Sequence, residues 1–96
     1  MRVVLTSATE ADLAAVLDWY DAEAPGVGLL FLDEFDALLR RLAANPQQFL
    51  RVRGDVRRAG FRRFLYGLHF RIRHDVVEVI ACLHASRAPL SWQARI

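Results

Sequence analysis

The period of the apolar residues changes once along this chain, at Pro46, and that change constrains the fold more than any other feature. Before Pro46 the apolar residues recur every three or four positions, which is typical of helices that bury one face. After Pro46 they alternate with polar residues, which is typical of strands that bury one face. A helical first half followed by a stranded second half predicts an α+β domain.

Two helices are predicted in the first half. The first carries the apolar stripe Leu13, Val16, Leu17, Tyr20 and Ala24, and the second, from about Leu29 to Ala44, carries Leu32, Phe35, Leu38, Leu39 and Leu42. Ser7 and Glu10 have the spacing of a capping box, which places the start of the first helix at Ser7. Pro25–Gly28 breaks the pattern between the helices. Because this connection is only four residues long, the helices should form an antiparallel hairpin.

Strands are predicted at Met1–Thr6, Val56–Arg62, Tyr66–Arg73 and Val77–His84. The last two form a β-hairpin that turns at His74-Asp75. In the first strand of this hairpin the buried face is Tyr66, Leu68, Phe70 and Ile72, opposite Gly67, His69, Arg71 and Arg73. In the second strand Val77, Val79, Ala81 and Leu83 alternate with Glu78, Ile80, Cys82 and His84. The order β-α-α-β-β-β predicts a helical hairpin packed on one face of a small, mainly antiparallel twisted sheet.

Length and composition exclude several classes of protein. The 96 residues predict a single domain over 1–96, and a hydrophobic share of 54% excludes a disordered chain. No apolar run approaches the roughly 18 residues needed to span a bilayer, and the first six residues are too short for a signal peptide. One cysteine, Cys82, excludes an internal disulfide framework and a zinc site with paired cysteines. We expect a cytoplasmic protein with no metal, no cofactor and no membrane partner.

Charge is segregated along the chain. Residues 1–48 hold three arginines and eight acidic residues, a balance of −5, whereas residues 49–96 hold ten arginines and three acidic residues, a balance of +7. Every one of the 13 basic residues is an arginine, whose planar fork binds phosphate or carboxylate with two hydrogen bonds. A GC-rich genome would explain the missing lysines but not the segregation. We expect Arg71 and Arg73, with Arg58 or Arg62, on the outer sheet face, where nucleic acid or an acidic protein segment would bind.

Four pieces of sequence together resemble the RelE/ParE superfamily of bacterial toxins from type II toxin–antitoxin operons. They are Glu10–Leu13 with Trp19-Tyr20; Pro25–Phe35; Arg62–Tyr66 followed by Phe70–Ile72; and Leu83–Trp92, which resembles a terminal H-x-x-R-x-P-x-x-W motif. Leu65 stands where the third piece usually has proline. The resemblance spans about residues 5–92. It implies a toxin that is held inactive by a cognate antitoxin, which wraps around it.

The superfamily divides by target, and the resemblance leaves both branches open. RelE-like members cleave mRNA on the ribosome, and ParE-like members poison DNA gyrase. In a RelE-like protein the catalytic candidates here are His84, Arg87, Arg71 and Arg73. Histidine is the only residue type among them whose ordinary pKa lies near neutral pH. The alternative role of His84 is structural, at the end of the last strand. The RelE-type lysines are missing and no acid/base pair is evident, so the sequence favours the ParE-like branch, whose members have no active site.

Six residues are candidates for binding nucleic acid or a protein target: Arg58, Arg62, Arg71, Arg73, Arg87 and Trp92. Trp92 has two interpretations. It can stack on a base, or it can bury itself against the sheet while Arg87 pairs with an acid of the first helix. A non-toxic nucleic-acid-binding domain that uses the same arginines is a further alternative.

The antitoxin implied by the resemblance needs a binding surface. Four large apolar residues exceed what a core of this size readily uses: Trp19, Leu30, Phe31 and Phe49. We expect them to line a groove between the helices and the sheet. A disordered antitoxin segment would fold there as an amphipathic helix, and its acidic residues would meet the arginines.

Overall fold

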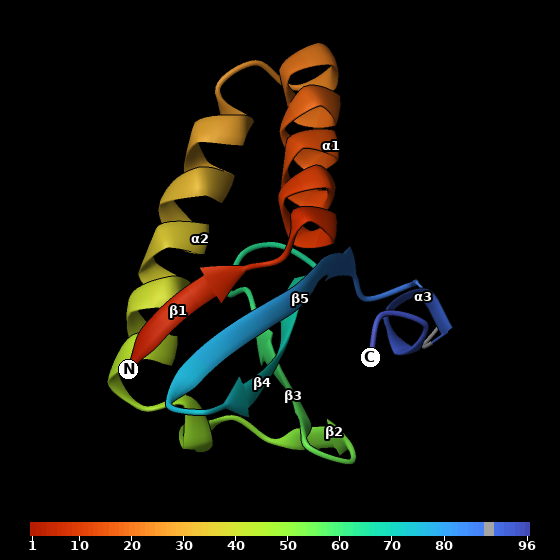
Figure 1. The fold of residues 1–96 in the computed structure, drawn as a ribbon. Helices are drawn as coiled ribbons and strands as arrows, with labels where there is room; N and C mark the ends of the chain where they lie inside the picture. Colours follow the sequence, from red (N-terminus) through yellow and green to blue (C-terminus); the bar gives the residue numbers. More distant parts are fainter. Residues whose placement is uncertain (88–89) are drawn as a thin grey trace.

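A computed structural model describes residues 1–87 and 90–96 of the chain (Figure 1). Strand β1 (Arg2–Leu5) leads into helices α1 (Ser7–Glu23) and α2 (Val27–Ala44), and a single 3₁₀ turn, η1 (Pro46–Gln48), follows. Four strands come next: β2 (Arg51–Arg53), β3 (Val56–Gly60), β4 (Tyr66–Arg73) and β5 (Val76–His84). A short helix, α3 (Leu90–Gln93), lies near the C-terminus. The predicted α+β order is confirmed, and β2 and α3 are additions to it.

The five strands form one mixed sheet in the order β1-β5-β4-β3-β2. Strand β1 runs parallel to β5, and the other neighbours are antiparallel. The helical hairpin connects β1 to the rest of the sheet and rises from one side of it, as Figure 1 shows. Strand β2 runs beside only Val56 and Arg57, so the outer edge of β3 beyond them has no strand partner in the part of the chain described.

Helix α1 begins at Ser7, as predicted, but its cap lies one residue earlier than predicted. Thr6, not Ser7, is the N-cap, and its Oγ1 accepts a hydrogen bond from the backbone N–H of Thr9 at 3.2 Å. The hydroxyl of buried Thr9 donates to the carbonyl of Val79 in β5 at 2.8 Å. Thr6 is better placed than Ser7 to cap the helix, because its own backbone N–H also donates to the carbonyl of Val79. This cluster fixes α1 to the centre of the sheet.

The hairpin of β4 and β5 has the predicted turn but not the predicted alternation. His74 and Asp75 both have positive φ, 50° and 65°, as a two-residue type I′ turn requires. Farther along, His69 pairs with Ala81 and Phe70 with Val79, so Ile80 is an extra residue in β5. Such a bulge reverses the alternation beyond it. Leu83 therefore lies on the outer face and Cys82 on the helix face, the opposite of the prediction.

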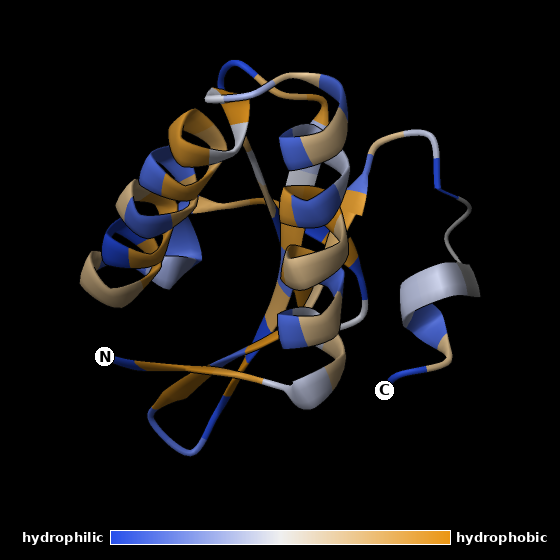
Figure 2. Cartoon of the chain, turned by 90° about the horizontal axis from the view of Figure 1, so that it is seen from above, coloured by the Kyte–Doolittle hydropathy of each residue, from blue (hydrophilic) through white to orange (hydrophobic). Residues whose placement is uncertain are grey.

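Each face of the sheet has its own core. Between the helices and the sheet lie Val16, Phe31, Phe35, Leu38, Leu42, Ala59, Leu68, Phe70, Val77, Val79 and Cys82. In Figure 2 the hydrophobic colour follows the strands and the sides of the helices near them. The outer face carries a smaller cluster of Val56, Ile80, Ala81, Leu83 and Trp92. Trp92 comes from α3, so the C-terminal segment covers part of the outer face.

One ion pair holds the C-terminal segment in place. The guanidinium of Arg95 binds both carboxylate oxygens of Asp12 in α1, at 2.6 and 3.0 Å, and also donates to the carbonyl of Ile80. The same carboxylate accepts the backbone N–H of Cys82 at 3.0 Å. The hydrogen bond that Arg95 donates to Asp12 is the main reason that the pKa of Arg95 is raised. Asp12 thus joins α1, β5 and the C-terminus.

Candidate functional site

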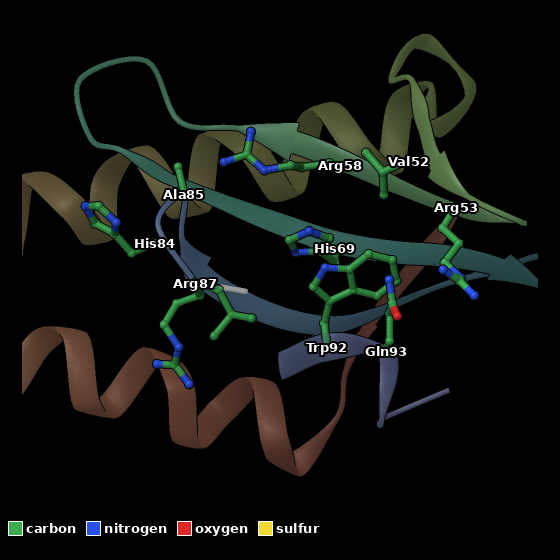
Figure 3. Close-up of a pocket in the computed structure, with 10 residues that line it drawn as sticks. Val52, Arg53, Arg58, His69, His84, Ala85, Arg87, Trp92 and Gln93 are labelled. Atoms are coloured by element: carbon green, nitrogen blue, oxygen red, sulfur yellow. The ribbon is translucent and has the colours of Figure 1, made fainter. Parts of the chain in front are cut away.

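A basic recess of about 340 Å³ lies on the outer face of the sheet, which we call the sheet-face recess (Figure 3). It is lined by Val52, Arg53, Arg58, His69, Leu83, His84, Ala85, Arg87, Trp92 and Gln93. Its lining includes three arginines and two histidines but no carboxylate. Among the described residues, the arginines that form salt bridges are Arg63, Arg71 and Arg95, and none of these three lines the recess. The recess is therefore a concentration of positive charge.

Arg58 holds its position in the recess because Gly67 has no side chain. The two residues lie on neighbouring strands, with Arg58 directly opposite His69 in the register. A Cβ atom at Gly67 would lie 2.5 Å from the Cζ of Arg58, closer than real Cβ contacts come. The guanidinium of Arg58 thus lies against the backbone of β4, half-buried, where a larger residue at position 67 would displace it.

His69 and Trp92 stack in the middle of the recess. Their ring centroids are 4.8 Å apart and their planes 23° apart. His69 is 7% exposed, and its Nδ1 is a buried nitrogen with no hydrogen-bond partner. Burial first, and then the charges of Arg58 and Arg95, lower the pKa of His69 to about 4, so the ring is neutral at pH 7. Trp92 is 6% exposed and buries itself against the sheet, as one of its two interpretations expected.

The structure does not bring the four catalytic candidates together. Arg73 pairs with Val76 beside the hairpin turn, whereas His84 pairs with Tyr66 at the far end of the hairpin. Seven residues of strand separate these ends, roughly 23 Å. Arg71 is neutralised by Glu78, with Nε 2.8 Å from Oε1. Of the four, only His84 and Arg87 line the recess. The two basic candidates on β4, Arg71 and Arg73, lie outside it.

His84 is fixed in one tautomer by the turn that follows it. Its Nδ1 accepts the backbone N–H of Ser86 at 3.0 Å and lies 2.8 Å from the Ser86 hydroxyl. Because Nδ1 needs its lone pair to accept that N–H, the ring proton of the neutral form is on Nε2. His84 is therefore arranged to donate a hydrogen bond from Nε2. A general base would need a free lone pair at that position.

Arg87 is exposed beyond the end of β5, and the hydrogen bond found for it is a backbone one, to His84. The partner for an acid of α1 is instead Arg95, which sequence reasoning did not single out. Ala88 and Pro89, which belong to the terminal motif, lie outside the described residues.

A second, larger depression of about 710 Å³ runs between α2 and the end of β3, which we call the α2–β3 groove. It is lined by Asp33, Glu34, Ala37, Leu38, Arg40, Arg41, Ala44, Gly60, Phe61, Arg62 and Arg63. Its centre is apolar and its rim carries four arginines. The unpaired part of the β3 edge borders it at Gly60.

Glu34 holds the rim of this groove in place. Its carboxylate accepts the backbone N–H groups of Arg62 and Arg63 and pairs with the Arg63 side chain at 3.2 Å. Burial alone would raise the pKa of Glu34, but these backbone and side-chain hydrogen bonds together lower it. Since Glu34 is committed to Arg63, the charge left in the lining is that of Arg40, Arg41 and Arg62 against Asp33, a balance of +2.

The four residues expected to bind an antitoxin do not form one groove. Trp19 and Leu30 are exposed, at 58% and 45%. Phe31 is completely buried, stacked on Phe61 at 4.5 Å, so it is a core residue and not a surface for a partner. Phe49 is half-buried, packed on Phe70, with the guanidinium of Arg41 5.0 Å from its ring centroid. The first turns of helix α2 contain four consecutive large apolar residues, Leu29–Leu32, and such a run does not indicate which of its side chains turn inward.

Within residues 1–87 and 90–96, no group of three or more His, Cys, Asp or Glu side chains is arranged to hold a metal ion. In the same part of the chain, no helix is long and apolar enough to cross a membrane. Cys82 is buried, and burial raises the pKa of its thiol to about 12.

Comparison with known proteins gives a consistent picture. The model of a family described as "ParE toxin of type II toxin-antitoxin system, parDE" matches residues 3–89. A solved structure described as "Chromosomal ParDE TA system from P. aeruginosa" is similar in fold, with a TM-score of 0.77 at 19% sequence identity. That likeness covers 88% of this chain and 95% of the other. Among curated proteins, none matches the sequence.

Proposed function

The chain belongs to the ParE toxin family of type II toxin–antitoxin systems, and from this premise we propose that it arrests growth by poisoning DNA gyrase. As a member of that family it is the toxin component of such a module, with a cognate antitoxin as its partner. The proposal concerns the target: the chain binds gyrase and traps its complex with cleaved DNA. It does so without chemistry of its own.

The main support for a gyrase target over mRNA cleavage is that the catalytic candidates do not lie together. Cleavage of mRNA needs a group that takes the proton of a ribose 2′-hydroxyl, close to others that stabilise the phosphate. Arg73 lies roughly 23 Å along the hairpin from His84, Arg71 is paired with Glu78, and the Nε2 of neutral His84 carries a proton. Arginine is a poor base because its pKa exceeds ~12. The described residues therefore favour a binding toxin over a ribonuclease.

Gyrase inhibition tests the proposal directly. Purified toxin should inhibit the supercoiling of relaxed plasmid by gyrase, and toxin mixed beforehand with its antitoxin should not. In a parallel reaction, primer extension on mRNA under translation should show no new cuts. New cuts in the mRNA, lost in His84→Ala and accompanied by normal supercoiling, would instead establish the RelE-like alternative.

For the antitoxin we propose the α2–β3 groove as the binding site. Its apolar centre suits the buried side of an amphipathic segment, and its rim of arginines suits acidic residues on that segment. The neighbouring edge of β3 beyond Arg58, whose own N–H is bonded to Leu50, offers backbone groups to an added strand. The groove thus replaces the surface expected from Trp19, Leu30, Phe31 and Phe49.

Charge reversal on this rim should weaken antitoxin binding. Arg40 and Arg62 are exposed and border the groove. The double variant Arg40→Glu/Arg62→Glu places like charges against an acidic partner, and we expect the dissociation constant to rise at least about tenfold, mainly through slower association. Calorimetry or surface plasmon resonance with purified antitoxin measures it.

A matched control for this experiment is Arg73→Glu, which reverses an exposed arginine beside the hairpin turn, outside the groove lining. The affinity of this variant for antitoxin should stay within about twofold of wild type, since an exposed charge far from the bound partner contributes little. Equal losses in the control and the double variant would place the antitoxin elsewhere.

A further inference from the structure

We propose that the sheet-face recess binds the phosphate backbone of single-stranded DNA. The choice of DNA over RNA rests on the proposed function, in which the target is an enzyme that holds DNA. The existence of an anion site in the recess does not rest on it. The charges, the burial and the shape of the recess indicate such a site by themselves.

The first argument is the charge that the recess leaves unbalanced. Arg53, Arg58 and Arg87 line it, and neither the lining nor the ion pairs found in the described residues supply a carboxylate for any of them. Three like charges beside one recess repel one another, and an anion between them relieves that repulsion. Guanidinium groups match phosphate in particular, through two parallel hydrogen bonds.

The second argument is that Arg58 is built into the site. Its guanidinium is half-buried against the backbone of β4, at a place that exists because residue 67 is glycine. A long side chain that served only solubility would extend into water and leave position 67 free for a larger residue. Here two positions, Arg58 and Gly67, combine to hold a cation in the wall of the recess.

The third argument is an unsatisfied buried nitrogen. His69 lines the recess, is more than nine-tenths buried, and has no partner for Nδ1 among the described residues. Buried polar atoms in folded proteins nearly always have a partner. Because this nitrogen is itself buried, a ligand supplies the missing partner only where binding shifts the stacked pair of His69 and Trp92. Trp92 stacks on the same ring, so the centre of the recess is aromatic while its borders are basic.

The shape of the recess indicates an extended ligand and not a single ion. Figure 3 shows Arg53 and Arg87 toward opposite ends of the recess, with Arg58 along one side and the His69–Trp92 pair between them. Cations spread along a line match successive phosphates of a strand. A volume of about 340 Å³ is that of a small-ligand pocket, which has room for one nucleotide of a strand but not for a duplex.

An acidic peptide is the competing occupant, and two observations disfavour it. The α2–β3 groove already offers an apolar centre with a basic rim, which suits an amphipathic acidic segment better. In the sheet-face recess three guanidinium groups surround a centre where His69 and Trp92 are nearly buried and stack on each other, so the recess offers charge to an anion and little apolar surface to a peptide. The peptide is therefore an outcome of the test and not part of the proposal.

Fluorescence anisotropy with a labelled DNA strand of about 12 nucleotides tests the proposal, at several salt concentrations. Three phosphate contacts should give a slope of log K against log salt of about −2, since each contributes about −0.7 on a single strand. Arg58→Ala and Arg53→Ala should each weaken binding about tenfold and make the slope shallower by about 0.7. Arg73→Ala, which removes the same charge from outside the recess, should bind like wild type.

Gly67→Ala separates geometry from net charge. It removes no charge, but its Cβ would displace the guanidinium of Arg58, so DNA binding should weaken severalfold while circular dichroism stays unchanged. If this variant fails to fold, the comparison of Arg58→Ala with Arg73→Ala decides alone. Absence of binding at low salt, or equal losses in Arg58→Ala and Arg73→Ala, would overturn the proposal.

Two further arms identify the ligand and keep the two proposals apart. If an RNA strand binds while the DNA strand does not, the choice of DNA is overturned. If an acidic peptide of equal charge binds as tightly as DNA, with the same dependence on Arg58, the recess is not a nucleic-acid site. If the toxin inhibits gyrase but binds no DNA strand, the recess proposal alone fails. If it binds DNA through Arg58 without inhibiting gyrase, the gyrase proposal alone fails.

Discussion

Replacing Phe31 with alanine is expected to lower the free energy of unfolding by about 3–5 kcal/mol, because the large ring leaves a cavity that its neighbours cannot fill. Phe31 is completely buried and stacks on Phe61 at 4.5 Å, with Phe64 and Tyr66 edge-on at 5.0 and 5.2 Å. It is the centre of an aromatic cluster that joins α2 to the loop between β3 and β4. For a domain with a stability of about 5–15 kcal/mol, this is a large fraction.

Urea unfolding followed by circular dichroism measures this effect. Leu30→Ala is the matched control, since the neighbouring side chain is 45% exposed and its loss should cost less than about 1 kcal/mol. The comparison also decides between the two roles considered for Phe31. A stable Phe31→Ala protein that has lost only its affinity for antitoxin would show that Phe31 belongs to the partner surface after all.

Acidification should destabilise the protein through His69. Its pKa falls from 6.5 in the unfolded chain to about 4 in the folded one, so the unfolded state binds the proton more readily. Stability from this residue is therefore fully present above about pH 6.5 and is lost as the pH falls through 4. The complete loss amounts to about 3 kcal/mol, of which about 2 kcal/mol appears between about pH 7 and pH 5.

The control for the acid effect is His69→Phe, which keeps an aromatic ring against Trp92 and removes the titrating group. Unfolding free energies of both proteins are compared between about pH 7 and pH 5. In this range the wild type should lose about 2 kcal/mol more than His69→Phe. Parallel pH profiles for the two proteins would mean that protonated His69 is accommodated in the fold. Glu34, whose pKa is lowered, contributes its loss at lower pH.

Much of the fold was predictable because it follows from local patterns. The change of period at Pro46, the break at Pro25–Gly28 and the turn at His74-Asp75 all act over a few residues. The strand β2 and the helix α3 were missed because each is only three or four residues long, too short to show a period. The bulge at Ile80 was missed for a different reason, since a bulge depends on the pairing with β4 and not on the sequence of β5 alone.

The candidate site was less predictable because it depends on long-range pairing. Sequence reasoning placed Arg58 and Arg87 among the basic candidates, and the structure brings both to the sheet-face recess. It gave no role to His69, because a histidine on an alternating strand carries no sign that a tryptophan some twenty residues later will cover it. The pairing of Asp12 with Arg95 spans most of the chain and leaves no local signal. Arg71 was a candidate until its register opposite Glu78 was known.

The central claim is that this chain acts on gyrase by binding and not by cleaving RNA. The most direct measurement is the trapping of gyrase cleavage complexes: plasmid, gyrase, ATP and toxin are incubated, and detergent and protease then release any broken DNA. The account predicts that linear plasmid accumulates with toxin dose and returns to background when antitoxin is added. Plasmid that stays intact at toxin levels that arrest growth, with new cuts appearing in translated mRNA, would contradict it.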